Sequence, residues 1–297
     1  MADRGMDILD HRLAPWAEAR LPHALAAPLI FVAKFAWAAL FGLLFLAAMV
    51  LTRAVWPEDW AMTRYDALLA FAVATQALFL WFRLETWEEA KVIAIFHVTG
   101  TAMEVYKLAQ GSWDYPGQSL FEIGGVPLFS GFMYASVGSF IARSVRLFHV
   151  QIAPYPVFGL TVALAVLIYL NFFTHHFLPD IRMALFAATL ILFWRTRIWF
   201  HVTDRAHWVP LPLAFLLAAL LVYGAENVGT FTRTWVYAGQ GAFDPVSPAK
   251  IGSWYLLLFV SFVSTTLILR DALHRAPIRP APREIYRNRA VIGAASR

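Results

Sequence analysis

The stretch from Glu104 to Gln118 reads EVYKLAQGSWDYPGQ, and its pattern returns from Glu226 to Gln240 as ENVGTFTRTWVYAGQ. Self-similarity at one fixed spacing predicts an internal structural repeat. Here it predicts two units that each place a glutamate ahead of a Trp-x-Tyr loop. At an offset of 122 residues the identical positions are Glu104/Glu226, Trp113/Trp235, Tyr115/Tyr237, Gly117/Gly239 and Gln118/Gln240.

The composition around these two stretches predicts an integral membrane protein. Of the 297 residues, 60% are hydrophobic and 14% are charged, and the mean hydropathy is +0.60. These values lie outside the range of soluble globular domains. A helix needs roughly 20 apolar residues to cross a bilayer, and the chain contains about eight such runs. We therefore predict an all-α polytopic membrane protein whose main partner is the lipid bilayer.

The apolar runs place about eight transmembrane helices along the chain, arranged as two parallel four-helix repeats. Residues 1–23 are predicted to be an interfacial N-terminal segment, 24–148 the first repeat, 149–269 the second repeat and 270–297 a basic cytoplasmic tail. Lys34, inside the first span, is expected to reach back to the lipid headgroups. The predicted spans are residues 28–51, 66–82, 92–109, 126–148, 157–173, 183–200, 210–227 and 251–269.

The distribution of basic residues predicts the orientation. Most Lys and Arg residues fall in the N-terminal segment, in the second, fourth and sixth loops, and in the C-terminal tail. By the positive-inside rule, both termini are then cytoplasmic, and both Trp/Tyr loops lie on the outer face of a bacterial inner membrane. Topology thus accounts for the net charge of +5, and no nucleic-acid partner is expected. The absence of cysteine excludes disulfides and thiolate metal sites.

The third predicted span carries ionisable residues on one face. His97, Thr101 and Glu104 are spaced by four and three residues, so they share a helical stripe, and Lys107 follows within reach of Glu104. An ionisable side chain at membrane depth usually faces a bundle interior or a cavity and has a partner. The seventh span repeats the arrangement around Glu226. Two carboxylic acids are therefore expected to point inward at a similar depth.

This arrangement leads to a hypothesis of proton-transfer chemistry on an isoprenoid or other lipid, without a cofactor. Burial of a carboxyl group favours its protonated form, which makes it a competent general acid. Aromatic π-faces stabilise a developing carbocation. Glu104 is predicted to be the general acid, Glu226 its partner base, and His97 a residue that tunes Glu104. The predicted substrate-binding residues are Lys107, Trp113, Tyr115, Gln118, Tyr223, Asn227, Trp235, Tyr237 and Gln240.

Three alternatives stay open. The same acids suit a small-solute or cation transporter, although no Gly- or Pro-broken helix is evident at mid-span. They also suit a purely structural role, in which a Glu104–Lys107 pair and polar contacts of Glu226 hold helices together. A metal site at His175 and His176 is a further possibility, but the dense histidine boxes of membrane di-iron enzymes are absent, so no metal is predicted. No phosphate-binding loop or nucleophile elbow is present.

The motifs also carry a family resemblance. GTAMEVYKLAQGSWDYP (100–116), GVPLFSGFMYASVGS (125–139) and AENVGTF (225–231) resemble the YoaT-like family of uncharacterised bacterial integral membrane proteins, over about residues 60–270. Ala238 stands where that family has a proline. The resemblance implies membrane location and no particular activity.

More distantly, the order of a helical glutamate, a Trp-x-Tyr loop and GVPL is similar to membrane carotenoid hydratases and lycopene cyclases. The matching residues here are Glu104, Trp113, Tyr115 and 125–128. That similarity implies protonation of a polyene by acids within a helical bundle. The acidic residues that follow the proline in the cyclases are replaced by Leu128 and Phe129, which argues against cyclisation.

Overall fold

The computed structural model describes residues 8–57, 59–203, 206–241, 244–268 and 270–276, and this part of the chain is mostly helical. The predicted helical class is therefore confirmed, with short strands added to it. The helices are η1 (Leu9–Leu13), α2 (Ala14–Arg20), α3 (His23–Ala38), α4 (Leu40–Val55), α5 (Arg64–Trp81), α6 (Trp87–Ala109), α7 (Phe129–Leu147), α8 (Phe158–Thr174), α9 (Arg182–Phe193), α10 (Leu211–Phe231), α11 (Ala249–Thr266) and η2 (Arg270–Ala272).

Helices occupy all the positions predicted for membrane spans, but they differ in length and polarity. By length and composition, α6 and α10 can each cross a membrane, and α3 with α4 forms a third candidate if the two count as one broken span. Helices α8 and α9 are apolar but shorter. Two to three spans are thus supported, while the eight-span arrangement in two four-helix halves stays a prediction.

The first predicted span is broken rather than continuous. Helix α3 ends at Ala38, α4 begins at Leu40, and their axes differ by 68°. Sharp bends usually occur at Pro or Gly, yet Ala39 stands at this one, with φ −83° and ψ 1°. Tertiary packing accounts for the bend, because α3 contacts α2 and α4 contacts α5. No local feature of the sequence announces it.

The sixth predicted span, 183–200, is only partly helical. Helix α9 ends at Phe193, and the chain continues as the strand β5 (Arg197–His201). Arg195 and Arg197 interrupt the apolar run, and the following Ile-Trp-Phe segment consists of residues that favour strands. Strand β5 pairs with β4 (Gln151–Ala153) and β6 (Ala206–Pro210) in an antiparallel sheet. The helical prediction for the end of this span was wrong.

The N-terminal segment packs onto the bundle instead of lying separately on its surface. Helix α2 and the turn η1 contact α3, and Asp10 Oδ1 lies 2.9 Å from Lys34 Nζ, with both side chains buried. The expectation that Lys34 reaches lipid headgroups was wrong, because η1 brings it a carboxylate partner inside the protein. Residues 1–7 of this predicted segment, and residues 277–297 of the predicted tail, lie outside the described residues.

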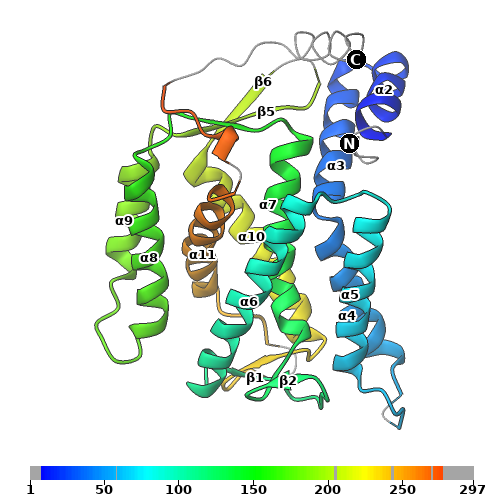
Figure 1. Ribbon diagram of the computed structural model, residues 1–297, viewed down its shortest axis with the longest axis vertical. Coiled ribbons are helices and arrows are strands. Elements are labelled where there is room, and N and C mark those ends of the chain that lie inside the picture. Colours follow the sequence, from blue (N-terminus) through cyan, green and yellow to red (C-terminus); the bar gives the residue numbers. More distant parts are fainter. Residues whose placement is uncertain (1–7, 58, 204–205, 242–243, 269, 277–297) are drawn as a thin grey trace.

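The two ends of the bundle carry different small sheets (Figure 1). The sheet β4–β5–β6 lies at one end together with α2, and Leu273, after η2, bridges to Ile152 of β4. The other end holds the two-residue strands β1 (Trp113–Asp114) and β7 (Val236–Tyr237), which pair with each other. It also holds the hairpin of β2 (Glu122–Ile123) and β3 (Val126–Pro127), whose turn residues Gly124 and Gly125 both have positive φ. That turn conformation favours glycine.

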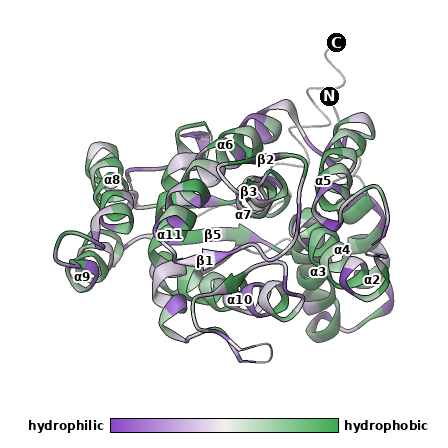
Figure 2. Cartoon of the chain, turned by 90° about the horizontal axis from the view of Figure 1, so that it is seen from below, coloured by the Kyte–Doolittle hydropathy of each residue, from purple (hydrophilic) through white to green (hydrophobic). Residues whose placement is uncertain are grey.

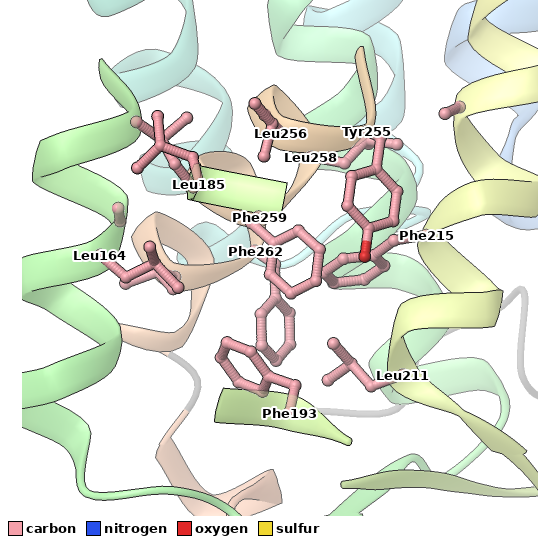
Figure 3. Close-up of a cluster of buried hydrophobic side chains, with 14 of the residues drawn as sticks. Leu164, Leu185, Phe193, Leu211, Phe215, Tyr255, Leu256, Leu258, Phe259 and Phe262 are labelled. Carbon is pink, nitrogen blue, oxygen red and sulfur yellow. The ribbon is translucent and has the colours of Figure 1, made fainter. Parts of the chain in front are cut away.

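A large apolar core lies among α8, α9, α10 and α11 (Figure 3). The rings of Phe215 and Phe259 pack edge-to-face at 4.5 Å, and Phe193 lies 5.2 Å from Phe259. A second core cluster joins α4, α5 and the start of α7, and it includes Tyr115 and Trp235 from the two Trp/Tyr loops. The loops are therefore part of the packed interior.

A buried polar cluster connects the α5–α6 connector to α7. Arg143 Nη2 lies 3.2 Å from Glu85 Oε1, and neither side chain is exposed. Ser139 Oγ donates to the same carboxylate at 2.9 Å, and Gln76 donates to its other oxygen. Arg146 Nε donates to Glu89 Oε1 at 2.9 Å. Glu85 and Glu89 of this segment are thus paired inside the protein, whereas Arg83, Glu88 and Lys91 are exposed.

The outer faces of the helices remain apolar, as the hydropathy colouring shows (Figure 2). Leu51 on α4, Ile191 on α9 and Leu221 on α10 are all more than half exposed. Large exposed apolar surfaces are unusual in a soluble monomer. They are the expected surface of a helical protein in contact with lipid, so a membrane location is plausible.

Candidate functional site

The site begins where two helices end in the same way. Helix α6 ends at Ala109 and α10 at Phe231, and the residue two positions later has positive φ in each case, 65° at Gly111 and 52° at Arg233. Ser112 N donates to Lys107 O at 3.1 Å, and Thr234 N donates to Gly229 O at 2.9 Å. Both bonds are the long bond of a Schellman cap, which turns the chain sharply out of the helix.

These caps direct the two Trp/Tyr loops against each other. Strands β1 and β7 are antiparallel, with Trp113 opposite Tyr237 and Asp114 opposite Val236. The rings of Trp113 and Tyr237 meet edge-to-face at 6.0 Å. Segments that are far apart in sequence therefore form one structure at one end of the bundle (Figure 1).

Tyr65 of α5 holds the two loops in place. Its hydroxyl donates to Thr234 O at 2.9 Å and accepts from Gly117 N at 3.1 Å. A Cβ at Gly117 would come within 2.7 Å of the Tyr65 ring, so the close approach requires glycine there. At the matching position Gly239 the reason is different, because φ is 74°.

Glu104 is buried and surrounded by three donors. Trp113 Nε1 donates to its Oε2 at 2.6 Å, Tyr115 Oη donates to the same oxygen at 2.7 Å, and Tyr134 Oη donates to Oε1. Burial and the neighbouring Glu104 carboxylate raise the pKa of the Tyr115 hydroxyl well above its ordinary value of 10.0, so it remains a donor. Glu104 thus anchors the first loop and α7 to α6.

Glu226 is equally buried but has fewer close partners. Tyr237 Oη lies 2.7 Å from Oε1 and 2.9 Å from Oε2, so one hydroxyl is shared between both oxygens. Burial and the neighbouring Glu226 carboxylate raise the pKa of the Tyr237 hydroxyl above 10.0. The indole of Trp254 also lies beside the carboxyl group. A carboxylate has about four acceptor positions, so Glu226 has more free acceptor capacity than Glu104, which accepts from three donors.

The tryptophans at matching positions have different roles. Trp113 bonds to Glu104, whereas the ring of Trp235 lies flat against α10 at Gly229. A Cβ at Gly229 would come within 1.9 Å of that ring. The sequence repeat therefore predicts the positions of the rings but not their individual contacts.

The lysines of the site do not neutralise the glutamates by direct ion pairs. Lys107 Nζ lies 2.9 Å from His176 Nε2 and 4.1 Å above the Phe172 ring. Lys250 Nζ lies 3.9 Å above the Tyr237 ring. The Glu104–Lys107 pair considered from the sequence does not form. Lys107 bonds instead to His176 of the α8–α9 connector, and Glu104 accepts hydrogen bonds from Trp113 and Tyr115 of the first loop.

Both glutamates and both lysines line one cavity of about 490 Å³. Its polar end collects the residues just described, and the remaining wall is mainly apolar side chains from α4, α7, α10 and α11. Of the predicted site residues, the lining includes Glu104, Lys107, Trp113, Tyr115, Glu226, Trp235 and Tyr237.

Tyr223 and Asn227 do not line the cavity. Tyr223 Oη donates to Val246 O at 2.6 Å, and Asn227 Oδ1 accepts from Val246 N at 2.9 Å. Together they fasten the segment that leads into α11. Gln240 also serves its own loop, since its side chain accepts from Tyr237 N and donates to Asp244 O.

His97 and Gln118 also lie away from the cavity lining. Gln118 is exposed. His97 lies two turns from Glu104 and packs against Phe132 at 4.4 Å, and its Nδ1 has no hydrogen-bond partner among the described residues. A Cβ at Gly131 would come within 2.4 Å of that nitrogen. The predicted tuning of Glu104 by His97 stays untested.

Sequence reasoning missed several cavity residues, chiefly Tyr134, Lys250 and Trp254. Tyr134 ends the segment GFMY (131–134), which is similar to GSWY (252–255) on α11, so a weak continuation of the repeat contained a signal. The aligned partner of Tyr134 is Tyr255, which is buried in the apolar core. It is Trp254 that approaches Tyr134, with ring centroids 6.2 Å apart.

The histidines do not gather into a metal centre. Within the described ranges, no group of three or more His, Cys, Asp or Glu side chains is arranged to hold an ion. His175 and His176 lie together, with ring centroids 4.2 Å apart. Burial, followed by the positive charges of Lys107 and His175, lowers the pKa of His176 below 6.5. His176 therefore favours the neutral form that accepts from Lys107.

Comparisons with known proteins now add to this geometry. The family described as "Protein of unknown function (DUF817)" matches residues 28–262. The chain belongs to the DUF817 family. A relative is the "Uncharacterized protein YoaT" of Bacillus subtilis (strain 168), with 40% identity over 237 residues, covering 78% of this chain and 89% of the relative. This bears out the resemblance to the YoaT-like family.

No solved structure matches this DUF817 protein. Neither the family description nor the name of the relative states an activity. The function of the DUF817 site must therefore be argued from its own geometry.

Proposed function

We propose that this DUF817 protein is a multi-pass membrane enzyme that transfers a proton to and from an apolar, isoprenoid-type ligand. One observation supports this most strongly: two buried carboxyl groups, Glu104 and Glu226, line the same largely apolar cavity. Clefts of a few hundred Å³ are typical of small-molecule sites. Helices at all eight predicted positions support eight crossings with both termini on the cytoplasmic side.

The two glutamates have different roles in this proposal. Glu104 accepts from Trp113, Tyr115 and Tyr134, so we assign it the task of fixing the cavity wall. Glu226 accepts from Tyr237 and lies beside the Trp254 indole, so it has fewer donors. We therefore assign proton exchange to Glu226, which takes the acid role predicted for Glu104 in addition to its own predicted role as base. The contact network is the reason for this change.

The chemistry needs no change of oxidation state. Protonated Glu226 gives its proton to one carbon of a double bond, which leaves a carbocation on the adjacent carbon. The π-faces of aromatic rings that line the cavity, such as that of Trp254, stabilise that positive charge. The Glu226 carboxylate then removes a proton from a neighbouring carbon, so the double bond has moved and the acid is restored.

Deuterium uptake tests this proposal directly. Purified protein is incubated in D₂O with polyprenyl lipids extracted from bacterial membranes, and carbon-bound deuterium is measured by mass spectrometry. We expect uptake by one lipid class with wild-type protein and none with Glu226→Gln. Glu88→Gln is the matched control, because Glu88 is exposed and forms an ion pair with Lys91. Uptake that survives Glu226→Gln, or no uptake in any lipid, would overturn the proposal.

A proton-coupled transporter is the second candidate, and the break between α3 and α4 favours it. Discontinuous membrane helices often form the binding sites of transporters, and Ala39, at the break, lines the cavity. The same Glu226 would then carry the coupled proton. Solute-dependent proton uptake by proteoliposomes under an imposed pH gradient, lost in Glu226→Gln, would favour transport over chemistry.

A further inference from the structure

Two of the four lysines in the chain lie in the cavity without a carboxylate partner. Lys107, in the last turn of α6, is 2% exposed, and Lys250 lies in the first turn of α11. Among the ion pairs of the described residues, neither lysine takes part. The other two lysines are both paired, Lys34 with Asp10 at 2.9 Å and Lys91 with Glu88 at 2.8 Å.

The acids nearest to these lysines are already engaged. Glu104 accepts from three donors and Glu226 from Tyr237. Asp180, in the α8–α9 connector, pairs with Arg182 at 3.1 Å. Glu226 and Glu104 act on Lys250 only at a distance, and a buried charge without a counter-charge in direct contact is costly. The C-terminal end of α6 offers Lys107 only partial negative charge, so the pair of lysines calls for an anion.

The surroundings of the lysines also favour an anion over a neutral polar group. Lys107 Nζ contacts the neutral acceptor His176 and the Phe172 ring, and Lys250 Nζ contacts the rings of Tyr237 and Trp113. These contacts orient the ammonium groups without neutralising them. Lys250 also lies at the N-terminal end of α11, where the helix dipole adds positive potential. Arg182 lines the same cavity.

The rest of the cavity is suited to an apolar chain. Its wall includes Met133 and Phe140 of α7, Leu221 of α10 and Leu46 of α4. Phe140 lies eleven residues beyond the start of α7 at Phe129, which corresponds to roughly 16 Å along the helix. Because α7 starts next to the two loops, the apolar wall extends from the charged end toward the middle of the bundle.

From this we infer that the cavity binds an amphiphile whose phosphate-type head group lies on Lys107 and Lys250 and whose hydrocarbon chain follows the apolar wall. The inference deepens the proposed function, on which it rests for treating the cavity as the ligand site. Two ammonium groups match the charge of a phosphate monoester better than that of a carboxylate. The head group fixes the chain so that a double bond can lie near Glu226.

Calorimetric titration of the full chain in phosphatidylcholine nanodiscs tests this inference. The probes are farnesyl monophosphate, farnesol, which has the same chain without the charge, and inorganic phosphate. We expect farnesyl monophosphate to bind about 30-fold or more tightly than farnesol, because a buried charge pair contributes strongly to affinity. Lys107→Met and Lys250→Met should each remove most of that difference. Lys91→Met, at an exposed lysine, should leave it unchanged.

Equal binding of farnesyl monophosphate and farnesol by wild-type protein would overturn the inference. So would inorganic phosphate binding as tightly as the amphiphile, since the ligand would then be a free anion. If the lysine variants do not fold, farnesol and farnesyl monophosphate on wild-type protein still decide the matter. The two proposals fail separately: charge-dependent binding by wild-type protein that shows no deuterium uptake would refute proton transfer but keep the anionic ligand.

Discussion

Trp113 and Tyr237 stand opposite each other in the β1–β7 ladder, and each bonds to the glutamate of the helix that precedes it in the chain. Trp113 Nε1 lies 2.6 Å from Glu104 Oε2, and Tyr237 Oη lies 2.7 Å from Glu226 Oε1. Their rings contact each other edge-to-face at 6.0 Å. A continuous chain of contacts therefore joins the ends of α6 and α10, which explains how both acids come to line one cavity.

The contact of Gly229 with Trp235 predicts that no larger residue is tolerated at position 229 of α10 without loss of stability. Gly229→Ala should lower the free energy of unfolding by roughly 2 kcal/mol, because its Cβ would overlap the indole ring. Gly224→Ala is the matched control in the same helix, since a Cβ there meets nothing within 4 Å. Thermal unfolding in detergent, followed by tryptophan fluorescence, compares the two variants. Equal melting temperatures would show that Trp235 moves aside without cost.

Because the Tyr65 hydroxyl bonds to both Trp/Tyr loops, its removal is expected to lower the stability of both. Tyr65→Phe leaves Thr234 O without its donor and Gly117 N without its acceptor, at a cost of about 1–3 kcal/mol. Tyr169→Phe is the control, because the Tyr169 hydroxyl is partly exposed and makes one long bond of 3.4 Å. Limited proteolysis should cut within residues 110–124 faster in Tyr65→Phe. Unchanged cleavage in Tyr65→Phe would mean that the β1–β7 pairing alone holds the loops.

The buried pair of Arg143 and Glu85 predicts a large effect of substitution on stability. Arg143→Met leaves the Glu85 carboxylate unpaired and should cost about 3–5 kcal/mol. Lys91→Met breaks the exposed pair with Glu88 and should cost about 0.5 kcal/mol or less. The denaturant concentration at the midpoint of unfolding measures the loss of stability in both variants. A double variant, Glu85→Gln with Arg143→Met, should recover part of the loss, and a further additive loss would argue against direct coupling.

His176 predicts a dependence of stability on pH. Its pKa in the folded protein lies below 6.5, because of burial and the charges of Lys107 and His175. As the pH falls below 6.5, the unfolded chain takes up the proton first, so folded-state stability is lost on acidification and is fully present above that pH. His176→Gln keeps an acceptor for Lys107 and does not titrate. Its melting temperature should fall less between pH 7 and pH 5 than that of wild type, and identical slopes would exclude His176 as the cause.

The sequence by itself determined the helical, lipid-compatible character of the chain. Long apolar runs favour helices, because each helix satisfies its own backbone hydrogen bonds; the run interrupted by Arg195 and Arg197, which ends in strand β5, is the exception. The repeat of Glu104 and Glu226, each followed by Trp-x-Tyr, also predicted residues that line one cavity. Local chemistry sufficed here, since both helices end in the same cap and the aromatic residues follow at the same spacing.

The tertiary structure alone decided the partners. The bend at Ala39 has no Gly or Pro to announce it, and Lys107 bonds to His176 across 69 positions of sequence instead of pairing with nearby Glu104. Tyr134 of α7 bonds to Glu104, and Lys250 of α11 lines the same cavity, although neither residue was predicted as part of the site. Helical spacing limits which residues share a face of one helix. Which faces meet depends on how whole helices pack, and that is a property of the entire bundle.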